Sequence, residues 1–262
     1  MSETLRDSAT SNGTEAAARV IDVLLLFTDG PSTLGVTHIA RELGLSKAVV
    51  HRILQSLVSR SALLFDPASR AYRLGPAVVA LGARSLRDSD LRRAALPVVR
   101  RLHEATDETT TLSELVGTER VYIDQMESTR EIRMTVEIGR RFPLHAGASS
   151  KAILAELPEP ELEAVLAAPL GRLTPETVVD PDRIRAELAA IRARGAAVSG
   201  GERQGGASSI ASAVRWADGR VVGAISVCGP IMRFDEATCE RYVPLVRDAA
   251  VDVSRALGWN GG

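Results

Sequence analysis

The sequence predicts an α+β protein of two domains, and three observations support this. Residues 34–74 have the periodicity and the turn residues of two short helices followed by a β-hairpin. From about residue 90, segments of alternating or β-branched residues occur between amphipathic segments, which predicts a mostly antiparallel sheet flanked by helices. The chain has 262 residues, 45% of them hydrophobic, and is therefore long enough for two cores.

The helix pair is predicted over residues 37–59. Gly44 ends the first helix, because glycine readily adopts the left-handed conformation that follows many helices. Ser46 suits the N-cap of the second helix, which runs to about Ser59. One face of that helix carries apolar residues at i, i+3, i+4 and i+7, namely Val50, Ile53, Leu54 and Leu57. This face is expected to be buried.

The opposite arc of the second helix is polar and partly cationic, as in a helix-turn-helix whose second helix enters the DNA major groove. A hairpin with strands at 63–65 and 71–74 and a turn at 66–69 follows directly, which makes the motif a winged one. Two arginines of the wing are placed to reach phosphates. The residues expected to contact DNA are Ser46, Lys47, Ala48, His51, Arg52, Gln55, Arg70 and Arg73.

The charge of the chain limits the kind of DNA binding. The formal net charge is −1, and residues 1–78 carry eight Arg or Lys against seven Asp or Glu. This balance argues against non-specific coating of nucleic acid, so binding has to come from a local patch and from shape. The alternative interpretation is an ordinary packed helix pair with a solvated outer face. The glycine turn, the serine cap and the wing together favour DNA binding.

Four consecutive parts of the chain are predicted. Residues 1–13 are polar and aperiodic, which predicts a disordered tail. Residues 14–75 form the winged helix-turn-helix domain, beginning with a helix over 15–28. Residues 76–89 form a linker helix, which is apolar on more than one side and is expected to pack against a second copy of the chain. Residues 90–262 form the second domain.

The elements of the second domain follow from periodicity and turn signals. They are a helix over 91–106 that contains Pro97, strands near 109–116, 120–126 and 132–138, a helix over 147–156, helices over 158–168 and 181–194, strands near 197–199, 208–216 and 221–228, and a closing helix over 236–257.

Six fragments in order resemble one known family. They are ARVIDVLLLF at 18–27, LGLSKAVVHRIL at 43–54, YRLGPAVVALG at 72–82, DLRRAALPVVRRL at 90–102, GRRFPLHAGASSKAILA at 139–155 and DGRVVGAISVCGP at 218–230. The chain is similar to IclR-type transcriptional regulators over about 14–258. The resemblance implies a GAF-like effector-binding domain and a regulator of a catabolic operon. Such a regulator binds a pseudo-palindromic DNA operator as a homodimer or homotetramer and responds to a small organic acid.

The segment 144–151 is the candidate ligand site. Small residues crowd the start of a helix here, and the N–H groups of a helix N-terminus suit a carboxylate. Close packing of the helix on the sheet is the alternative explanation. The resemblance implies that this turn borders the effector cavity and that hydroxyl and thiol groups face it. The effector-binding residues it implies are Ala148, Ser149, Ser199, Ser209, Ser226 and Cys228.

The loop at 199–209 departs from the family pattern. Ser208 and Ser209 stand where many members have an Arg-Cys pair, and two glycines, 200 and 201, replace acidic residues. Glu202 and Arg203 are retained, as in a subset of members. Four glycines make the loop mobile unless a ligand or partner orders it. The effector of a relative therefore does not transfer to this chain.

An enzyme is the competing class. The four histidines show no metal-ligand spacing, and there is neither a nucleophile elbow nor a phosphate-binding glycine loop. We therefore expect no catalytic residue, no metal and no cofactor. A third class, a structural partner-binding protein with a winged domain, would not need a second domain with a polar cavity. Two cysteines without paired spacing and the lack of a long apolar run predict a cytoplasmic protein with no membrane partner.

Overall fold

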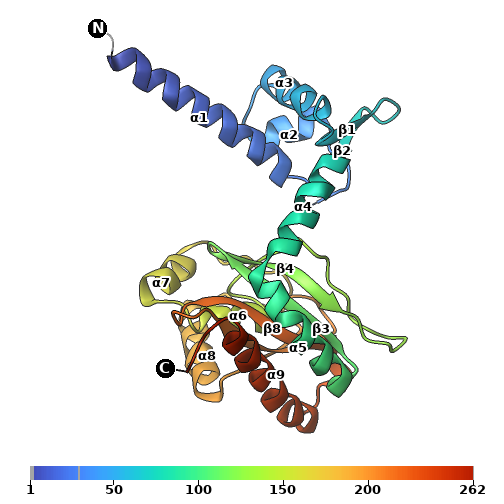
Figure 1. Ribbon diagram of the computed structural model, residues 1–262, viewed down its shortest axis with the longest axis vertical. Helices are drawn as coiled ribbons and strands as arrows, with labels where there is room; N and C mark the ends of the chain where they lie inside the picture. The colour runs from blue at the N-terminus through green and yellow to red at the C-terminus, as the bar shows by residue number, and fades with distance from the viewer. Residues whose placement is uncertain (1–2, 29, 262) are drawn as a thin grey trace. The chain divides into compact units, whose positions relative to one another are not determined.

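The computed structural model describes residues 3–28 and 30–261, which divide into two compact units (Figure 1). The first unit ends at Leu86 and the second begins at Arg87. Each unit is described by itself. Within the described ranges, none of the helices combines the length and the apolar character needed to cross a bilayer.

The first unit is a winged helix-turn-helix. Its elements are α1 (Glu3–Leu25), α2 (Val36–Glu42), α3 (Lys47–Val58), β1 (Leu63–Asp66), β2 (Ala71–Leu74) and most of α4 (Pro76–Asp88). Gly44 between α2 and α3 has a φ of +64°, and the Ser46 hydroxyl accepts the Val49 N–H as an N-cap. The predicted helix pair and hairpin are therefore confirmed to within one or two residues.

The start of α1 differs from the prediction. The helix begins at Glu3 rather than near residue 15, so residues 3–13 are helical where a disordered tail was expected, and residues 1–2 lie outside the described part. Nucleation is the unfavourable step of helix formation. Once the alanine-rich turn at 16–18 is helical, each residue added at its N-terminal end forms one more hydrogen bond, and the cost of nucleation does not recur. Lack of apolar periodicity did not exclude such an extension. The helix ends at Leu25, earlier than the predicted residue 28.

An antiparallel sheet forms the centre of the second unit. Its strands are β3 (Thr109–Val116), β4 (Glu119–Met126), β5 (Arg141–Pro143), β6 (Ala197–Gly200), β7 (Ala207–Arg215) and β8 (Val221–Pro230). Among the described residues they form a six-stranded sheet in the order β5-β4-β3-β8-β7-β6 with every neighbouring pair antiparallel. The α+β class and the antiparallel sheet are therefore confirmed.

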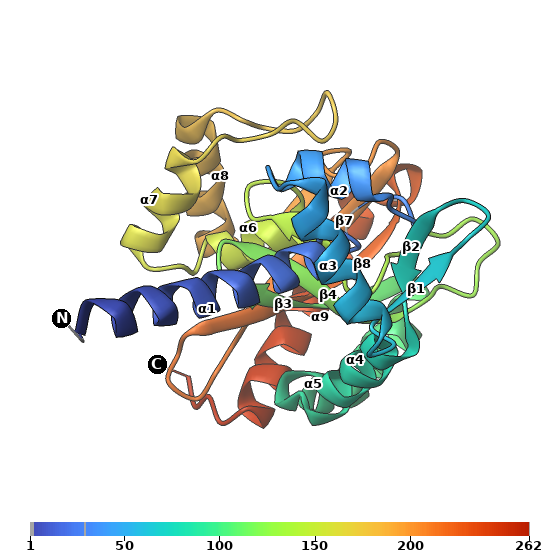
Figure 2. The same cartoon turned by 90° about the horizontal axis from the view of Figure 1, so that it is seen from above.

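Helices cover both faces of this sheet (Figure 2). They are α5 (Asp90–Thr106), α6 (Ala148–Leu154), α7 (Glu159–Ala167), α8 (Pro181–Arg194) and α9 (Glu236–Ala256), with a short 3-10 turn at Ile231–Arg233. Helices α5 and α9 pack on each other and on the sheet, and α6 packs on β7 and β8 with α8 behind it. Figure 2 shows α6, α7 and α8 on one side of the sheet and α5 and α9 on the other.

The register of the strands gathers small polar residues on the face toward α6. Side chains alternate along a strand, so partners directly opposite each other share a face. Thr111 lies opposite Ser226, and Ser209 lies opposite Cys228. The intervening positions, such as Ile225, are fully buried on the other face. Because the residues toward α6 are small, space remains between the sheet and that helix.

The strand predicted at 132–138 is wrong. This segment has no regular secondary structure, and β5 lies instead at Arg141–Pro143. The side-chain amide of Gln125 replaces a strand partner there, since it donates to the Val136 carbonyl (2.8 Å) and accepts the Val136 N–H (2.9 Å). Val136 is buried, so the β-branched residues of the segment do pack, but without a ladder. Over so short a segment, a buried loop and a hydrogen-bonded strand have the same pattern of apolar residues, so the sequence could not distinguish them.

Candidate DNA-binding face and effector cavity

The outer face of α3 exposes the side chains expected to meet DNA. On the inner face Val50 and Leu54 are fully buried and Leu57 is nearly so, while Ile53 is only half-buried. This burial fixes the rotation of the helix about its axis. The exposed positions are Ser46, Lys47, Ala48, His51, Arg52 and Gln55. The structure therefore brings the six predicted helix positions together on one accessible surface.

The wing is held in shape by Asp66. Its carboxylate accepts the Ala68 N–H (3.0 Å) and the Ser69 hydroxyl (2.6 Å). These hydrogen bonds, the Ser69 one foremost, hold the pKa of Asp66 below its usual value. Arg70 follows in the left-handed region at φ +54°, and Arg73 pairs with Leu64 across the hairpin. Both wing arginines are exposed.

A cavity lies between the sheet and the start of α6 in the second unit. The cavity is small. The volume that the centre of a water molecule can occupy inside it is about 20 Å³, which is room for about one water. Gly147, at φ +87°, turns the chain into α6 beside it. The six predicted effector-binding residues all line this cavity: Ala148, Ser149, Ser199, Ser209, Ser226 and Cys228.

The predicted polar groups are already engaged in part. The Ser226 hydroxyl shares a hydrogen bond with Thr111 Oγ1 (2.7 Å), and the Ser199 hydroxyl donates to Glu202 (3.0 Å). Burial raises the pKa of the Cys228 thiol to about 12. Cys228 is therefore a neutral thiol at physiological pH, and it contributes a weak S–H donor rather than a nucleophile.

Arg120 is a cavity residue that sequence reasoning missed. It lies on β4 and is 1% exposed. Its guanidinium donates to Ser150 (2.8 Å), to Ser113 (3.0 Å) and to the Tyr122 hydroxyl (3.1 Å), and burial lowers its pKa. All three acceptors are neutral hydroxyls. Among the described residues, no carboxylate lies within ion-pair distance of Arg120.

Glu202 and Arg203, which were not among the expected effector-binding residues, also line the cavity. The Glu202 carboxylate accepts the Gly147 N–H (3.4 Å) and pairs with the buried Lys151 (2.6 Å). The start of α6 thus already has an anion from its own chain. The Arg203 guanidinium lies 5.0 Å from the centre of the Phe142 ring. The glycine-rich loop is therefore anchored at Glu202, not mobile throughout.

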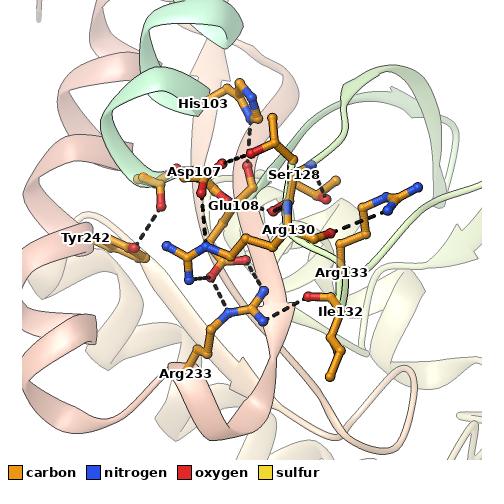
Figure 3. Close-up of polar contacts among 12 residues, drawn as sticks. His103, Asp107, Glu108, Ser128, Arg130, Ile132, Arg133, Arg233 and Tyr242 are labelled. Carbon is orange, nitrogen blue, oxygen red and sulfur yellow. Dashed lines mark hydrogen bonds and ion pairs between the residues drawn. The ribbon is translucent and has the colours of Figure 1, made fainter.

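The loop beyond β4 is held by a separate charge network around Glu108 (Figure 3). Glu108 is 1% exposed and accepts two hydrogen bonds of 2.6 Å from Arg233, with Arg130 at 3.2 Å. The Thr109 hydroxyl donates to the carbonyl of Met134 (2.5 Å), a cavity-lining residue. This network therefore fixes one wall of the cavity from outside it.

One signal could have revealed Arg120 from the sequence. Residues two apart on a strand share a face, and Arg120 is two residues before Tyr122 in β4. An arginine on the buried side of a predicted strand is unusual, because unpaired charges are rarely buried. Glu202 and Arg203 offered no such periodic signal, since they lie in a loop.

The two units define a class, which is a winged helix-turn-helix protein with a separate ligand-binding domain. Two family descriptions match the chain, "IclR helix-turn-helix domain" over residues 16–67 and "Bacterial transcriptional regulator IclR C-terminal" over residues 83–255. The regulator BhcR of Paracoccus denitrificans is 34% identical over 250 residues, which cover 95% of this chain and 88% of that protein. This chain belongs to the IclR family of transcriptional regulators, and its relatives are regulators rather than enzymes.

Solved structures agree with this assignment. A crystal structure of an IclR transcriptional regulator from Silicibacter sp. TM1040 has a TM-score of 0.85 at 31% identity and covers 94% of this chain and 98% of its own. An IclR homologue from Microbacterium hydrocarbonoxydans in complex with 4-hydroxybenzoate has a TM-score of 0.75 at 28% identity, with coverage of 92% and 98%. The predicted family and fold are therefore confirmed.

Proposed function

We propose that this regulator binds a pseudo-palindromic operator sequence-specifically, as a homodimer or homotetramer, and that a small organic acid in the cavity controls the binding. The observation that supports DNA recognition most directly is the outer face of α3, where the expected contacts are exposed while the inner face is buried. The contacts to bases or adjacent phosphates are made by Lys47, His51, Arg52 and Gln55. The contacts to the DNA backbone beside the wing are made by Arg70 and Arg73.

The linker helix supports assembly of two copies. None of the α4 side chains is buried, and Val79 and Leu81 are 70% and 71% exposed. Apolar side chains so exposed on a helix between two domains suit packing against the same helix of a second copy. A dimer presents two copies of α3, and these read two half-sites about one helical turn apart. Such a regulator of a catabolic operon acts in the cytoplasm, where its operator is.

Acid control rests on the cavity and its charges. The lining combines hydroxyls with two arginines, Arg120 and Arg203, and arginine is the side chain best suited to a carboxylate. An IclR homologue from Microbacterium hydrocarbonoxydans has been solved in complex with 4-hydroxybenzoate, an acid of this class, which supports the proposal. The acid changes operator affinity only if it binds two arrangements of the DNA-binding units with different affinity.

A gel-shift titration tests the proposal. The full-length protein is mixed with the DNA upstream of its own gene at a fixed salt concentration, with unrelated DNA as competitor. A discrete shift that survives the competitor, and that an acid from a panel of small carboxylates strengthens or weakens, supports both parts. Where that promoter gives no shift, selection of bound fragments from the whole genome decides. Failure to enrich any sequence contradicts operator binding.

A further inference from the structure

The buried charges of the second unit differ in whether they have a partner. Glu108 is paired with Arg233 at 2.6 Å, and Lys151 is paired with Glu187 at 2.5 Å and with Glu202 at 2.6 Å. Arg120 is 1% exposed and, among the described residues, has hydroxyl partners only. A charge removed from water without a counter-charge is costly, so the surroundings of Arg120 lack an anion.

The Arg120 guanidinium also keeps donors available. A guanidinium has five N–H groups in a planar fork. Single hydrogen bonds from Nε and from each terminal nitrogen account for three of them. Two N–H groups therefore have no acceptor among the described residues, on a side chain that lines the cavity. A carboxylate matches such donors in geometry and in charge.

A second arginine lies against the same aromatic pair. The Arg120 guanidinium is 4.4 Å from the centre of the Tyr122 ring, and that of Arg203 is 5.8 Å from the same centre and 5.0 Å from the Phe142 centre. The two like charges repel, and Arg203 contributes to the lowered pKa of Arg120. Arg203 is half-buried and makes ring contacts but no hydrogen bond to any described residue, so its side chain can move to admit an occupant.

The cavity also has an acidic acceptor. Glu202 follows β6 at one edge of the sheet, whereas Arg120 lies on β4 near the other edge. The Glu202 carboxylate accepts one hydroxyl hydrogen from Ser199 at Oε1, which leaves acceptor capacity on that oxygen. A second carboxylate placed there would be repelled, while an O–H or N–H group of a ligand would be accepted.

We propose that Arg120, with Arg203, binds the anionic group of the effector and that Glu202 accepts a hydrogen bond from a hydroxyl or N–H elsewhere on it. The effector is then a small acid that carries a hydrogen-bond donor, such as a hydroxy acid. This inference rests on the proposed acid control of the regulator and specifies the chemistry of the same cavity.

The test uses matched sets of ligands and isothermal titration calorimetry on the full-length protein. Each set contains an acid without a donor, the corresponding hydroxy acid and its uncharged amide: propionate, lactate and lactamide, then butyrate, 3-hydroxybutyrate and 3-hydroxybutyramide, then benzoate, 3-hydroxybenzoate and 3-hydroxybenzamide. In at least one set the hydroxy acid is expected to bind about 10- to 100-fold more tightly than both comparators, as loss of a charge-assisted hydrogen bond predicts.

Variants separate the two halves of the proposal. Arg120→Gln and Arg203→Gln should each remove the preference for the acid over the amide, and Glu202→Gln should reduce the preference for the hydroxyl alone. Arg203 is half-buried, so its variant keeps the test valid if Arg120→Gln does not fold. The matched control is Arg215→Gln, because Arg215 pairs with Glu156 at 2.6 Å and does not line the cavity.

Thermal unfolding without ligand gives a readout independent of ligand identity. Arg215→Gln breaks an ion pair and should lower the midpoint, whereas Arg120→Gln removes an uncompensated charge and should leave it unchanged or raise it. A lowered midpoint with unchanged acid affinity would show that Arg120 is structural and would overturn the proposal.

Ligand outcomes distinguish this inference from the proposed function. If acids and amides bind equally, the assigned role of the two arginines is overturned. If acids bind equally with and without the hydroxyl, the assigned role of Glu202 is overturned. In both cases control of the regulator by a ligand remains. If operator binding is specific but none of the acids binds or alters it, acid control fails and this inference fails with it.

Discussion

The two units assemble their candidate sites in different ways. In the DNA-binding unit, the helix positions from Ser46 to Gln55 lie within three turns of α3 and its cap, and the wing follows directly. In the effector unit, the cavity draws on β4, the turn before α6, the loop after β6, and strands β7 and β8. Charges in the first site are exposed, while in the second Arg120 and Glu202 are buried and Arg203 is half-buried. Solvent therefore stabilises the first set, and only specific partners stabilise the second.

The largest expected effect tests that dependence on partners. Glu108→Ala leaves Arg233 without its counter-charge and Arg130 with only Asp107, so the free energy of unfolding should fall by about 3–5 kcal/mol. Urea unfolding followed by tryptophan fluorescence measures it, because Trp216 and Trp259 both lie in the second unit. The exposed Glu104→Ala is the control. A fall in the free energy of unfolding of less than about 1 kcal/mol would show that buried charges in the second unit do not depend on specific partners.

The next effect concerns the exposed face of α3. Arg52→Ala and Gln55→Ala should each weaken binding to the specific operator by about 1–3 kcal/mol, or about 5- to 150-fold, through loss of base or adjacent phosphate contacts. Unfolding should change little, since both side chains are exposed. Gel shifts measure the effect, and Arg255→Ala removes the same charge from the second unit as a control. An unchanged footprint with both substitutions would contradict this placement of the recognition helix.

A smaller effect is expected at one cavity hydroxyl. Ser226→Ala removes the hydrogen bond to Thr111 and a hydroxyl that lines the cavity, and should weaken the response to the proposed acid effector about 2- to 10-fold. Operator affinity without effector should stay the same. Ser212→Ala is the control, because its hydroxyl also makes a hydrogen bond, a part-buried one to the Gly195 carbonyl, but does not line the cavity. An undiminished response would place the ligand elsewhere.

The smallest effect is in the wing turn. Because the Ser69 hydrogen bond is the main interaction that holds the pKa of Asp66 below its ordinary value, ionised Asp66 stabilises the turn at pH values above that ordinary pKa. The stabilisation is lost as pH falls through the lowered pKa. Asp66→Asn should likewise speed hydrogen exchange at the Ala68 amide near neutral pH while the Val50 amide in α3 keeps its rate. Equal exchange of Ala68 in both proteins would show that the carboxylate does not hold the turn.

The same difference between the units explains what the sequence could predict. A helix face repeats every three to four residues, so Val50, Leu54 and Leu57 were enough to predict the buried side of α3 and, by exclusion, the exposed one. The cavity residues instead depend on strand register. Ser226 and Cys228 were found through the family resemblance, and periodicity alone would not have placed them together.

The errors have the same physical origin. Gln125 satisfies the backbone of Val136 with its side chain, an interaction that no local pattern contains. The position of Arg120 on the buried side of a strand could be predicted, but its partners could not, because the strand pattern does not show which groups surround the guanidinium.

The size of the cavity has a consequence for the rate at which the proposed effector would bind. Because only about 20 Å³ is open to water centres, the proposed acid would enter only after part of the wall had moved. The frequency of that movement, rather than diffusion, would then limit the association rate, and the ligand would leave only when the wall opened again. Such a receptor would average over brief fluctuations in concentration and register those that persist.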